Sequence, residues 1–585
     1  MARPRTLALG AALAVAAPLA LYGVSAPASA HDNGGSSHKK PNRVLIVLFD
    51  QMVPQYADQF AMPNFRKLRG DGTYFKDAYL GYTASETVMA HNIIMSGQLP
   101  KNMGWTDEAY RDTNNLLGNG PDSMNITGDL SLSDFGKLIN GAYQGASYKK
   151  LADYLHAAQP GKKFIVVGEK SYAVESAAAP NADIAVRLAS RASVEPCKTT
   201  LGGQYRYPKG KNVPTYLAPL DPANTADPQF CNRFYINADK ANDYGTLAAY
   251  PSWLYPEEGN RFFRGTDPSA AAHPGGDVWA ADAAIEMMTR EQWSGMFVTL
   301  GGIDKAGHMW GAQKDAATFA GSCTVGTPAE VGAAQTHVRC AAEEADVQLG
   351  KLMSTVKALD KADGGETLVV LTADHGATYG DTFYGKTTSK AGDSNWYWAP
   401  NGVWDGGAFD TTTYNAPSPA LLPLNADGNL AFSYQSTEIE AWLTEPTTAK
   451  KQAKAQVMLG LPGVTAAYYR DGSHYVLVGT NSMTKSEKKW WKQHGQELVD
   501  SMAVANGPDV LGLLHDKTSY GVYGDHGGTQ ESVQRIPIVF WSKSLAAHER
   551  SDAPIRTVDI MPTILKAMGL TPVGPLDGRA FKLDD

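Results

Sequence analysis

The chain has 585 residues, more than one simple hydrophobic core requires, so we expect one large domain with insertions or two to three domains. Its 52 basic and 60 acidic residues give a formal net charge of −8. This balance disfavours a nucleic-acid-binding protein, which usually carries a basic face, and no specific nucleic-acid binding is expected.

The amino-terminal segment 1–30 has the pattern of a secretory signal peptide. Two arginines precede an almost wholly apolar stretch, 7–24, and Ala28-Ser29-Ala30 fits a cleavage site. We expect cleavage after Ala30 and a secreted protein. An uncleaved membrane anchor is the alternative, because the apolar stretch is nearly long enough to span a bilayer. Residues 31–42 are expected to form a flexible leader, and no later stretch is apolar enough for a transmembrane segment in the mature chain.

Four cysteines follow the predicted signal peptide. In an exported protein an even number of cysteines suggests disulfides, and we expect disulfide bonds here. Three connectivities are possible. The local one pairs Cys197 with Cys231 and Cys323 with Cys340.

Three short apolar runs rich in β-branched residues predict buried strands, and each is followed by a carboxylate. Helical patterns separate the runs, so the sequence predicts an α/β fold with a parallel sheet and helices on both faces. Open sheets of this kind bind ligands at the carboxyl ends of their strands, and the acids therefore indicate a metal site. The three pairs are residues 43–49 with Asp50, 295–300 with Asp304, and 367–372 with Asp374.

Histidines accompany two of these acids. His375 directly follows Asp374, and Gly376 then allows the backbone to turn away tightly. The alternative is a turn that merely carries two polar residues. His308 follows Asp304 by four positions, so on a helical turn both side chains lie on one side, within reach of one ion.

Thr87 lies just ahead of an apolar segment with helical spacing, Val88–Met95. A hydroxyl at this position has two interpretations. It can cap the helix, which is a common role of threonine. It can also be a nucleophile whose developing phosphate is held by the helix N-terminus.

Two long segments interrupt the alternating pattern. Residues 172–276, rich in Ala, Pro, Asn and Gly, are expected to form an inserted cap. Residues 380–519 are expected to form a second insertion with a small α/β subdomain. Its aromatic part, 380–435, is either a substrate-facing lid or a long surface insertion. Within the second insertion we expect a helix over 438–459 and a β-hairpin that turns at Asp471-Gly472.

The ordered set of motifs resembles the alkaline phosphatase superfamily, and within it the type I phosphodiesterase/nucleotide pyrophosphatase group. The resemblance covers most of residues 43–150, 277–376 and 520–585. It implies a doubly wound, mostly parallel sheet and a catalytic core of residues 43–171, 277–379 and 520–585. The motifs are Asp50 after the first strand, Thr87 before a helix, MSGQLP at 95–100, Asp304-x-x-x-His308, Asp374-His375-Gly376, His526-Gly527, and VDIMPT at 558–563 in a closing helix.

The resemblance further implies two divalent metal ions, and mixed Asp/His ligation favours zinc among common ions. One site would be formed by Asp304, His308 and His526. The other would be formed by Asp50, Asp374 and His375, with Thr87 completing it. Thr87 would attack phosphorus and form a covalent phospho-threonine, which water then releases. His91 and Asp525, which flank these motifs, are expected to be structural.

Two departures from the family pattern bear on the substrate, a phosphoric ester. Glu108 stands where family phosphodiesterases usually carry an asparagine that binds a phosphoryl oxygen. Related phosphomonoesterases often carry Lys-x-Arg where this chain has Lys170-Ser171-Tyr172, so the lysine is present and the arginine is missing. We expect Glu108 and Lys170 to lie at the substrate site, and we favour phosphodiesters.

Other functions remain as alternatives. A phosphomonoesterase would use the same metal centre. A non-catalytic, metal-stabilised binding protein of the same fold would be free to lose the nucleophile, and the intact Thr87 argues against it. The sequence has no Cys-x-Pro-x-Arg sulfatase signature, and no G-x-G-x-x-G follows the first strand, as a dinucleotide-binding oxidoreductase would require.

Overall fold

A computed structural model describes residues 39–126, 131–140, 148–191, 205–217, 236–237, 276–304, 307, 334–379, 381–382, 419–521, 524–550 and 554–583. The predicted signal peptide and His308 lie outside these ranges. So do Cys197, Cys231 and Cys323, and the side chain of Cys340 is not described, so disulfide bonding stays a prediction. Within the described ranges, no helix combines the length and the apolar character needed to cross a bilayer.

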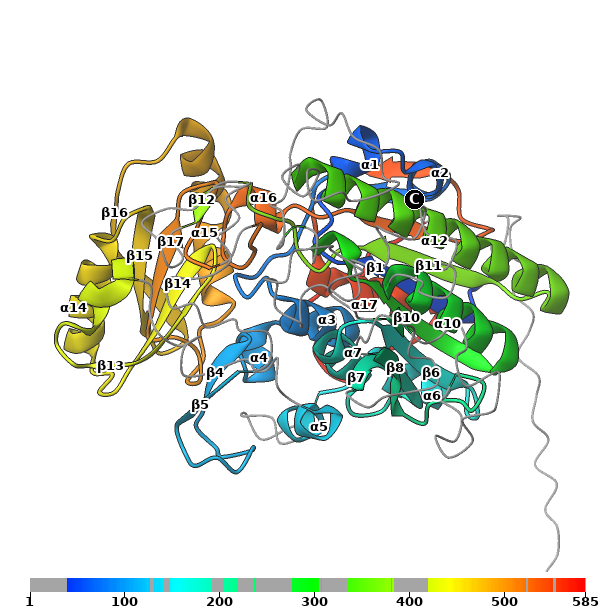
Figure 1. Ribbon diagram of the computed structural model, residues 1–585, viewed down its shortest axis with the longest axis horizontal. Coiled ribbons are helices and arrows are strands. Elements are labelled where there is room, and N and C mark those ends of the chain that lie inside the picture. Colours follow the sequence, from blue (N-terminus) through cyan, green and yellow to red (C-terminus); the bar gives the residue numbers. More distant parts are fainter. Residues whose placement is uncertain are drawn as a thin grey trace, which may run out of the picture. The chain divides into compact units, whose positions relative to one another are not determined.

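The centre of the molecule is a ten-stranded sheet, in which five neighbouring strands run parallel (Figure 1). The register is level at the carboxyl ends, with Phe49 opposite Leu300 and Leu48 opposite Thr372. Whatever follows these strands therefore meets at one edge. In sheet order they are β11 (Thr367–Thr372), β1 (Arg43–Phe49), β10 (Trp293–Leu300), β6 (Lys163–Gly168) and β7 (Ile184–Arg191).

Mixed strands extend the sheet on both sides. Beyond β11 lie β19 (Ile538–Trp541), which is antiparallel to β11, then β2 (Thr73–Phe75) and β20 (His548–Arg550). Beyond β7 lie β8 (Tyr205–Lys211) and β9 (Ile236–Asn237), both paired antiparallel. The mostly parallel α/β fold is thus confirmed.

Helices cover both faces of this sheet. For this reason β1, β10 and β11 are buried along their whole length. Helices α10 and α12 pack against each other, and α3 packs against α7 and α17. The main helices are α2 (Pro63–Asp71), α3 (Thr87–Ser96), α6 (Leu151–Ala158), α7 (Ser171–Ala178), α10 (Gly276–Arg290), α12 (Ala334–Asp363) and α17 (Ile560–Met568).

The segment 172–276, expected to be an inserted cap, instead contributes β7, β8 and β9 to the central sheet. Buried Ile184, Ala185 and Val186 pair in parallel with β6 and extend the core by one more strand. The surrounding Ala- and Pro-rich composition hides this short apolar run in the sequence. Part of the segment therefore belongs to the core.

A second, five-stranded antiparallel sheet lies within the predicted second insertion (Figure 1). The hairpin at Asp471-Gly472 is confirmed, and Gly472 supplies the positive φ of 61° in its turn. In sheet order the strands are β13 (Leu430–Gln435), β14 (Glu438–Leu443), β17 (Val510–Leu514), β15 (Val464–Asp471) and β16 (His474–Thr480). Helices α14 (Thr448–Leu459) and α15 (Lys485–Asp500) belong to the same region.

The helix expected over 438–459 is wrong in its first part, which is strand β14. Ile439 and Ala441 alternate with polar residues and pack into the apolar core of the second sheet. Helix α14 begins only after Pro446, where the Thr447 hydroxyl accepts a hydrogen bond from the Lys450 N–H as an N-cap. As a result, Glu438 and Glu440 lie on the opposite face of the strand from Ile439.

A buried ion pair ties the start of β1 to the end of α12. The Arg43 guanidinium lies 2.6 Å from the carboxylates of both Asp360 and Asp363. Asp360 is buried and also accepts hydrogen bonds from the backbone and hydroxyl of Thr367, whereas the Asp363 side chain is half exposed. The two aspartates thus offer a matched comparison.

We expect Asp360→Asn to lower the free energy of unfolding by about 3 kcal/mol, because it leaves a buried guanidinium short of its counter-charge. Asp363→Asn should cost less than about 1 kcal/mol, since water compensates for the lost exposed partner. Urea unfolding of both variants measures the difference. Equal, small losses would show that the buried pair adds little.

Candidate active site and metal centre

Three acids and two histidines converge at the carboxyl edge of the central sheet. Asp50 follows β1, Asp304 follows β10, and Asp374 and His375 follow β11. His526 comes from the segment that precedes α16 (Glu531–Gln534). All five side chains are buried. The level register of the parallel strands places residues so distant in sequence beside one another.

Their potential ligand atoms form two groups, each within 4.8 Å. One group is Asp50, Asp374 and His375, and the other is Asp304, His375 and His526. His375 Nε2 lies 3.5 Å from an Asp50 oxygen and 3.6 Å from an Asp374 oxygen, while His526 Nε2 lies 3.5 Å from an Asp304 oxygen. The two imidazoles stack with 3.6 Å between ring centres. The two groups contain the predicted Asp and His ligands of the described ranges, and His375 is shared by both. Their role as metal ligands stays a prediction.

The donor set fits divalent cations. Oδ1 of Asp50 and Oδ2 of Asp374 are buried and accept no hydrogen bond. The ammonium of Lys170 instead lies between the groups, 2.6 Å from Asp50 and 2.5 Å from Asp304. A buried amine drawn onto two carboxylates marks a position where positive charge is required. Lys170 was expected at the substrate, and here its charge is directed to the acids.

The pKa values of the clustered acids and of His375 are shifted because these groups are buried close together. Burial, reinforced by Asp374, raises the pKa of Asp50 well above its ordinary value. Burial also raises the pKa of Asp374 to about 6. The pKa of His375 is well below its ordinary value because of burial and the neighbouring His526 ring. A neutral imidazole has a lone pair available for a metal.

Thr87 is the first residue of α3, and the N-cap position belongs to Glu86, whose backbone is extended. The capping interpretation of Thr87 is therefore wrong. Its hydroxyl oxygen instead lies 3.4 Å from Nε2 of His375, the residue that the two groups share. The helix N-terminus, with its free N–H groups, begins at the same point.

A partner on Nδ1 fixes the orientation of each of the two imidazole rings, His375 and His526. The Glu86 carboxylate lies 2.8 Å from His526 Nδ1, and the Gly376 carbonyl lies 3.1 Å from His375 Nδ1. Each ring therefore presents Nε2 to the acids, as is usual for metal-bound histidines. Burial alone would lower the pKa of His526, but Glu86 raises it well above its ordinary value.

Gln51 is a site residue that sequence reasoning missed. It has a positive φ of 64°, which costs energy in a non-glycine residue. Its backbone N–H donates to Asp374, and its side-chain amide donates to Asp304 and to the Gly524 carbonyl, at 3.1, 3.1 and 2.7 Å. Gln51 thus holds both acids and the segment that carries His526. The sequence signal was its position directly after a strand-end carboxylate.

Three other expected residues are also placed. His91 is bonded on both ring nitrogens, to the Thr87 carbonyl and the Thr299 hydroxyl at 2.7 and 2.8 Å, and burial lowers its pKa to about 3. Asp525 accepts a hydrogen bond from the Ser519 hydroxyl at 2.6 Å. Both arrangements fit structural roles. Glu108 lies at the start of α3, where its carboxylate accepts a long, 3.5 Å contact from the Val88 N–H.

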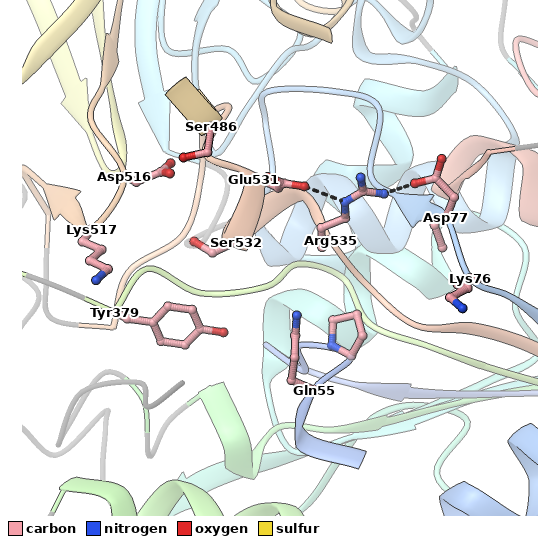
Figure 2. Close-up of a pocket in the computed structure, with 12 residues that line it drawn as sticks. Gln55, Lys76, Asp77, Tyr379, Ser486, Asp516, Lys517, Glu531, Ser532 and Arg535 are labelled. Carbon is pink, nitrogen blue, oxygen red and sulfur yellow. Dashed lines mark hydrogen bonds and ion pairs between the residues drawn. The ribbon is translucent and has the colours of Figure 1, made fainter. Parts of the chain in front are cut away.

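A separate cavity lies away from these groups, and none of the predicted ligands lines it. Figure 2 shows Arg535 at this cavity between Asp77 and Glu531, both of which are its ion-pair partners. Lys76 and Lys517 lie on the same lining. With Arg535 held by two acids, this cavity offers little free positive charge to an ester, and the metal-ligand groups are the better candidate for the chemistry.

Comparison with known families gives a match over residues 44–387, more than half of the chain, to "Type I phosphodiesterase / nucleotide pyrophosphatase". The chain belongs to this family. It is accordingly a phosphoric ester hydrolase. The matched range carries Asp50, Thr87, Asp304 and the Asp374-His375 pair.

Solved structures of an alkaline phosphatase share the fold of this chain at low sequence identity. A quadruple mutant and the wild type of the alkaline phosphatase PafA match with TM-scores of 0.56 and 0.54, 16% identity, and coverage of 93% of this chain and 99% of theirs. Human ectonucleotide pyrophosphatase / phosphodiesterase 5 matches at 0.46 and 10% identity, covering 92% of this chain and 97% of its own. The PafA likeness is one of fold. Comparison with curated proteins finds no match.

Gly376 has a different role in this protein from the expected tight turn. Its φ is not positive. A Cβ on Gly376 would instead lie 2.1 Å from the Ser532 carbonyl oxygen, and the Gly376 N–H donates to the Val533 carbonyl at 2.7 Å. The turn that carries Asp374 and His375 is thus pressed against the backbone before β19.

We expect Gly376→Ala to destabilise the protein by about 1–3 kcal/mol, because the methyl group must displace the 532–533 backbone or the turn itself. The shift should also lower the bound metal content. Gly70→Ala is the control, since no atom lies within 4 Å of its added methyl and the residue sits in α2. That change should leave stability equal or raise it by about 0.5–1 kcal/mol. Thermal unfolding and metal analysis measure both variants, and an unchanged Gly376→Ala would contradict the packing argument.

Proposed function

We propose that the protein hydrolyses phosphodiesters through a covalent phospho-threonine on Thr87, at a centre of two zinc ions. The observation that carries the proposal is the Thr87 hydroxyl, 3.4 Å from His375 and beside the Asp50, Asp374 and His375 group. A hydroxyl that sits among buried metal-ligand candidates and at a helix N-terminus has the setting that a nucleophile towards phosphorus requires.

The two groups would each hold one zinc ion, Asp304 and His526 with His308 in one and Asp50, Asp374 and His375 in the other. Mixed carboxylate and imidazole ligation is typical of zinc. Two such ions would lower the pKa of the Thr87 hydroxyl and stabilise charge on the attacking and leaving oxygens. Gln51 and Glu86 keep the ligands in place through the contacts described above.

In the first half of the reaction, the Thr87 oxygen forms a bond to phosphorus and the ester oxygen leaves as an alcohol, taking the proton. In the second half, water attacks the same phosphorus, the Thr87 oxygen leaves and recovers its proton from that water, and the remaining phosphomonoester is released. The N–H groups at the start of α3 are placed to receive phosphoryl oxygens. The Glu108 carboxylate, which contacts the Val88 N–H in this structure, would compete with a phosphoryl oxygen for that N–H.

The substrate class rests on the charges next to Thr87. A phosphomonoester carries one more negative charge than a diester and needs more cationic partners. Glu108 adds a carboxylate at the helix start, and the ammonium of Lys170 is held by Asp50 and Asp304. Both features favour the singly charged diester. A phosphomonoesterase at the same centre is the second candidate, because Lys170 would be released if metal ions took its place on the acids.

We further propose that the chain acts outside the cell, on the basis of its signal-like segment 1–30.

We expect Thr87→Ala to fold, retain two zinc ions and lose at least about a thousandfold in turnover of an aryl phosphodiester, since the nucleophile is gone. Thr87→Ser should keep measurable activity because the attacking oxygen remains. Acid quenching of the wild type with an aryl phosphodiester, followed by mass spectrometry, should detect on Thr87 a phosphoryl group that still carries the remaining ester substituent. Retention of more than about a tenth of wild-type turnover by Thr87→Ala would remove the nucleophile assignment.

We expect Glu108→Asn to raise turnover of an aryl phosphodiester, because it removes a negative charge and supplies an amide donor at the helix start. One charge-assisted contact is worth about 1.5–3 kcal/mol, or about tenfold to a hundredfold in rate. The measurement compares an aryl phosphodiester, an aryl phosphomonoester and an aryl sulfate on both enzymes. Glu108→Gln is the control for charge alone with the side-chain length kept. A large loss of activity in both variants would show that Glu108 itself assists the reaction.

A further inference from the structure

A third group of acids lies outside the two metal-ligand groups. Asp107, Glu438 and Glu440 each place a carboxylate oxygen within 4.8 Å of the others. Their exposed fractions are 2%, 1% and 1%. None of the three belongs to the motifs that indicated the catalytic centre. Three buried carboxylates in contact need an explanation, because each would lose water and repel its neighbours.

Two separate parts of the chain build this group. Glu438 and Glu440 project from one face of β14, with Trp442 following them on that face. Asp107 lies in the loop between α4 (Pro100–Met103) and β4 (Ala109–Asp112), and its Oδ1 accepts a 2.6 Å hydrogen bond from the Glu108 N–H. Arg111 in β4 donates to the Leu443 carbonyl at 2.8 Å, which fixes the loop against the strand.

The two glutamates have no cationic partner within the described part of the chain. All four of their carboxylate oxygens are buried without a well-formed hydrogen bond, and the polar groups that face them are the Gly528 N–H at Glu438 and the Asp107 carboxyl at Glu440. Among the described ion pairs, none involves Asp107, Glu438 or Glu440. Burial raises the pKa of both glutamates well above the ordinary value, and the neighbouring Asp107 and Glu86 raise the pKa further. The group is thus strongly short of positive charge.

We propose that Asp107, Glu438 and Glu440 bind a divalent cation that prefers oxygen ligands, Ca²⁺ or Mg²⁺, in addition to the two-metal centre. The donors are carboxylate oxygens alone, with no histidine or cysteine, which favours these hard ions over zinc. Calcium binds oxygens at about 2.3–2.6 Å, so two ligands of one ion lie at most about 5 Å apart. The 4.8 Å limit of the group falls within that span.

The ion joins the second sheet to the loop that carries Glu108. That loop ends at the start of β4, and Ala109 packs with Phe432, Tyr434 and Trp442 of the second sheet. Glu86, which holds His526, also acts on both glutamates through its charge. The site therefore sets the position of Glu108 and of the second sheet relative to the start of α3.

The rival explanation is that the carboxyls are protonated and share their hydrogens. The zinc-loaded full chain distinguishes the two. In equilibrium dialysis at neutral pH, with CaCl₂ in one arm and MgCl₂ in the other, we expect one further ion per chain from the arm that matches the site. The same salt should raise the unfolding temperature in step with its concentration. Absence of a further bound ion in both arms up to 10 mM salt would overturn the proposal.

Terbium provides a local readout. Trp442 lies on β14, the strand that carries both glutamates, and Tyr434 of β13 is the cross-strand partner of Glu440. Bound Tb³⁺ in the zinc-loaded chain should show emission sensitised by these rings, and Ca²⁺ or Mg²⁺ should compete it away. Emission that neither ion competes for would count against the site.

Glu440→Gln and Glu438→Gln keep the shape of the side chains and remove one charge each. Loss of a residue that only hydrogen-bonds to a metal ligand weakens metal binding by about 10–100-fold. Loss of a ligand itself should therefore weaken binding at least about tenfold. Glu445→Gln, just beyond β14 and exposed, is the matched control and should bind as the wild type does. Unchanged affinity in both cluster variants would overturn the assignment to this group. If a variant fails to fold, the dialysis of the wild-type chain still decides.

Discussion

The mutual repulsion of buried carboxylates at the ends of β1, β10 and β11 is the constraint on which the site depends. Two carboxylates 4 Å apart repel each other by about 4 kcal/mol at an effective dielectric constant of about 20. Asp50, Asp304 and Asp374 are therefore stable together only with compensating charge, and the Lys170 ammonium supplies part of it. The strained Gln51 and the Glu86–His526 pair keep the surrounding ligands in place despite that cost. The parallel sheet makes the crowding unavoidable, because it brings all three strand ends to one edge.

The sequence predicted this edge well because the signals were local. An apolar strand followed by an acid identifies a candidate ligand and its position at once, as with Asp50 and Asp374. The resemblance to a family supplied Thr87, which residue patterns alone left between cap and nucleophile. For Gln51 the only local signal was its position directly after Asp50, because its role depends on a backbone conformation that only the folded chain shows.

The segments 438–443 and β7 were assigned wrongly because each is a short run, in which the two-residue side-chain period of a strand is hard to tell from its surroundings. Over 438–443 the alternation Glu-Ile-Glu-Ala-Trp-Leu is short enough to merge with the helical pattern after Pro446. The β7 run was hidden in the same way by alanine- and proline-rich surroundings. Reading 438–443 as a helix also hid the acids, because only a strand places Glu438 and Glu440 on one face. Domain boundaries and the site residues' roles remain predictions that experiments must test.

The contact between Gln51 and Gly524 joins residues 473 positions apart. Chains fold progressively from the amino terminus during synthesis, yet the last metal-ligand candidate of this protein follows that distant glycine. A ribosome-bound or truncated chain can assemble most of the parallel sheet without His526, and its acids then face one another with the ring missing. The Asp304 group is therefore the last to be completed: a fragment that lacks residues 526–585 keeps Asp50, Asp374 and His375 but loses the imidazole that His526 brings to Asp304.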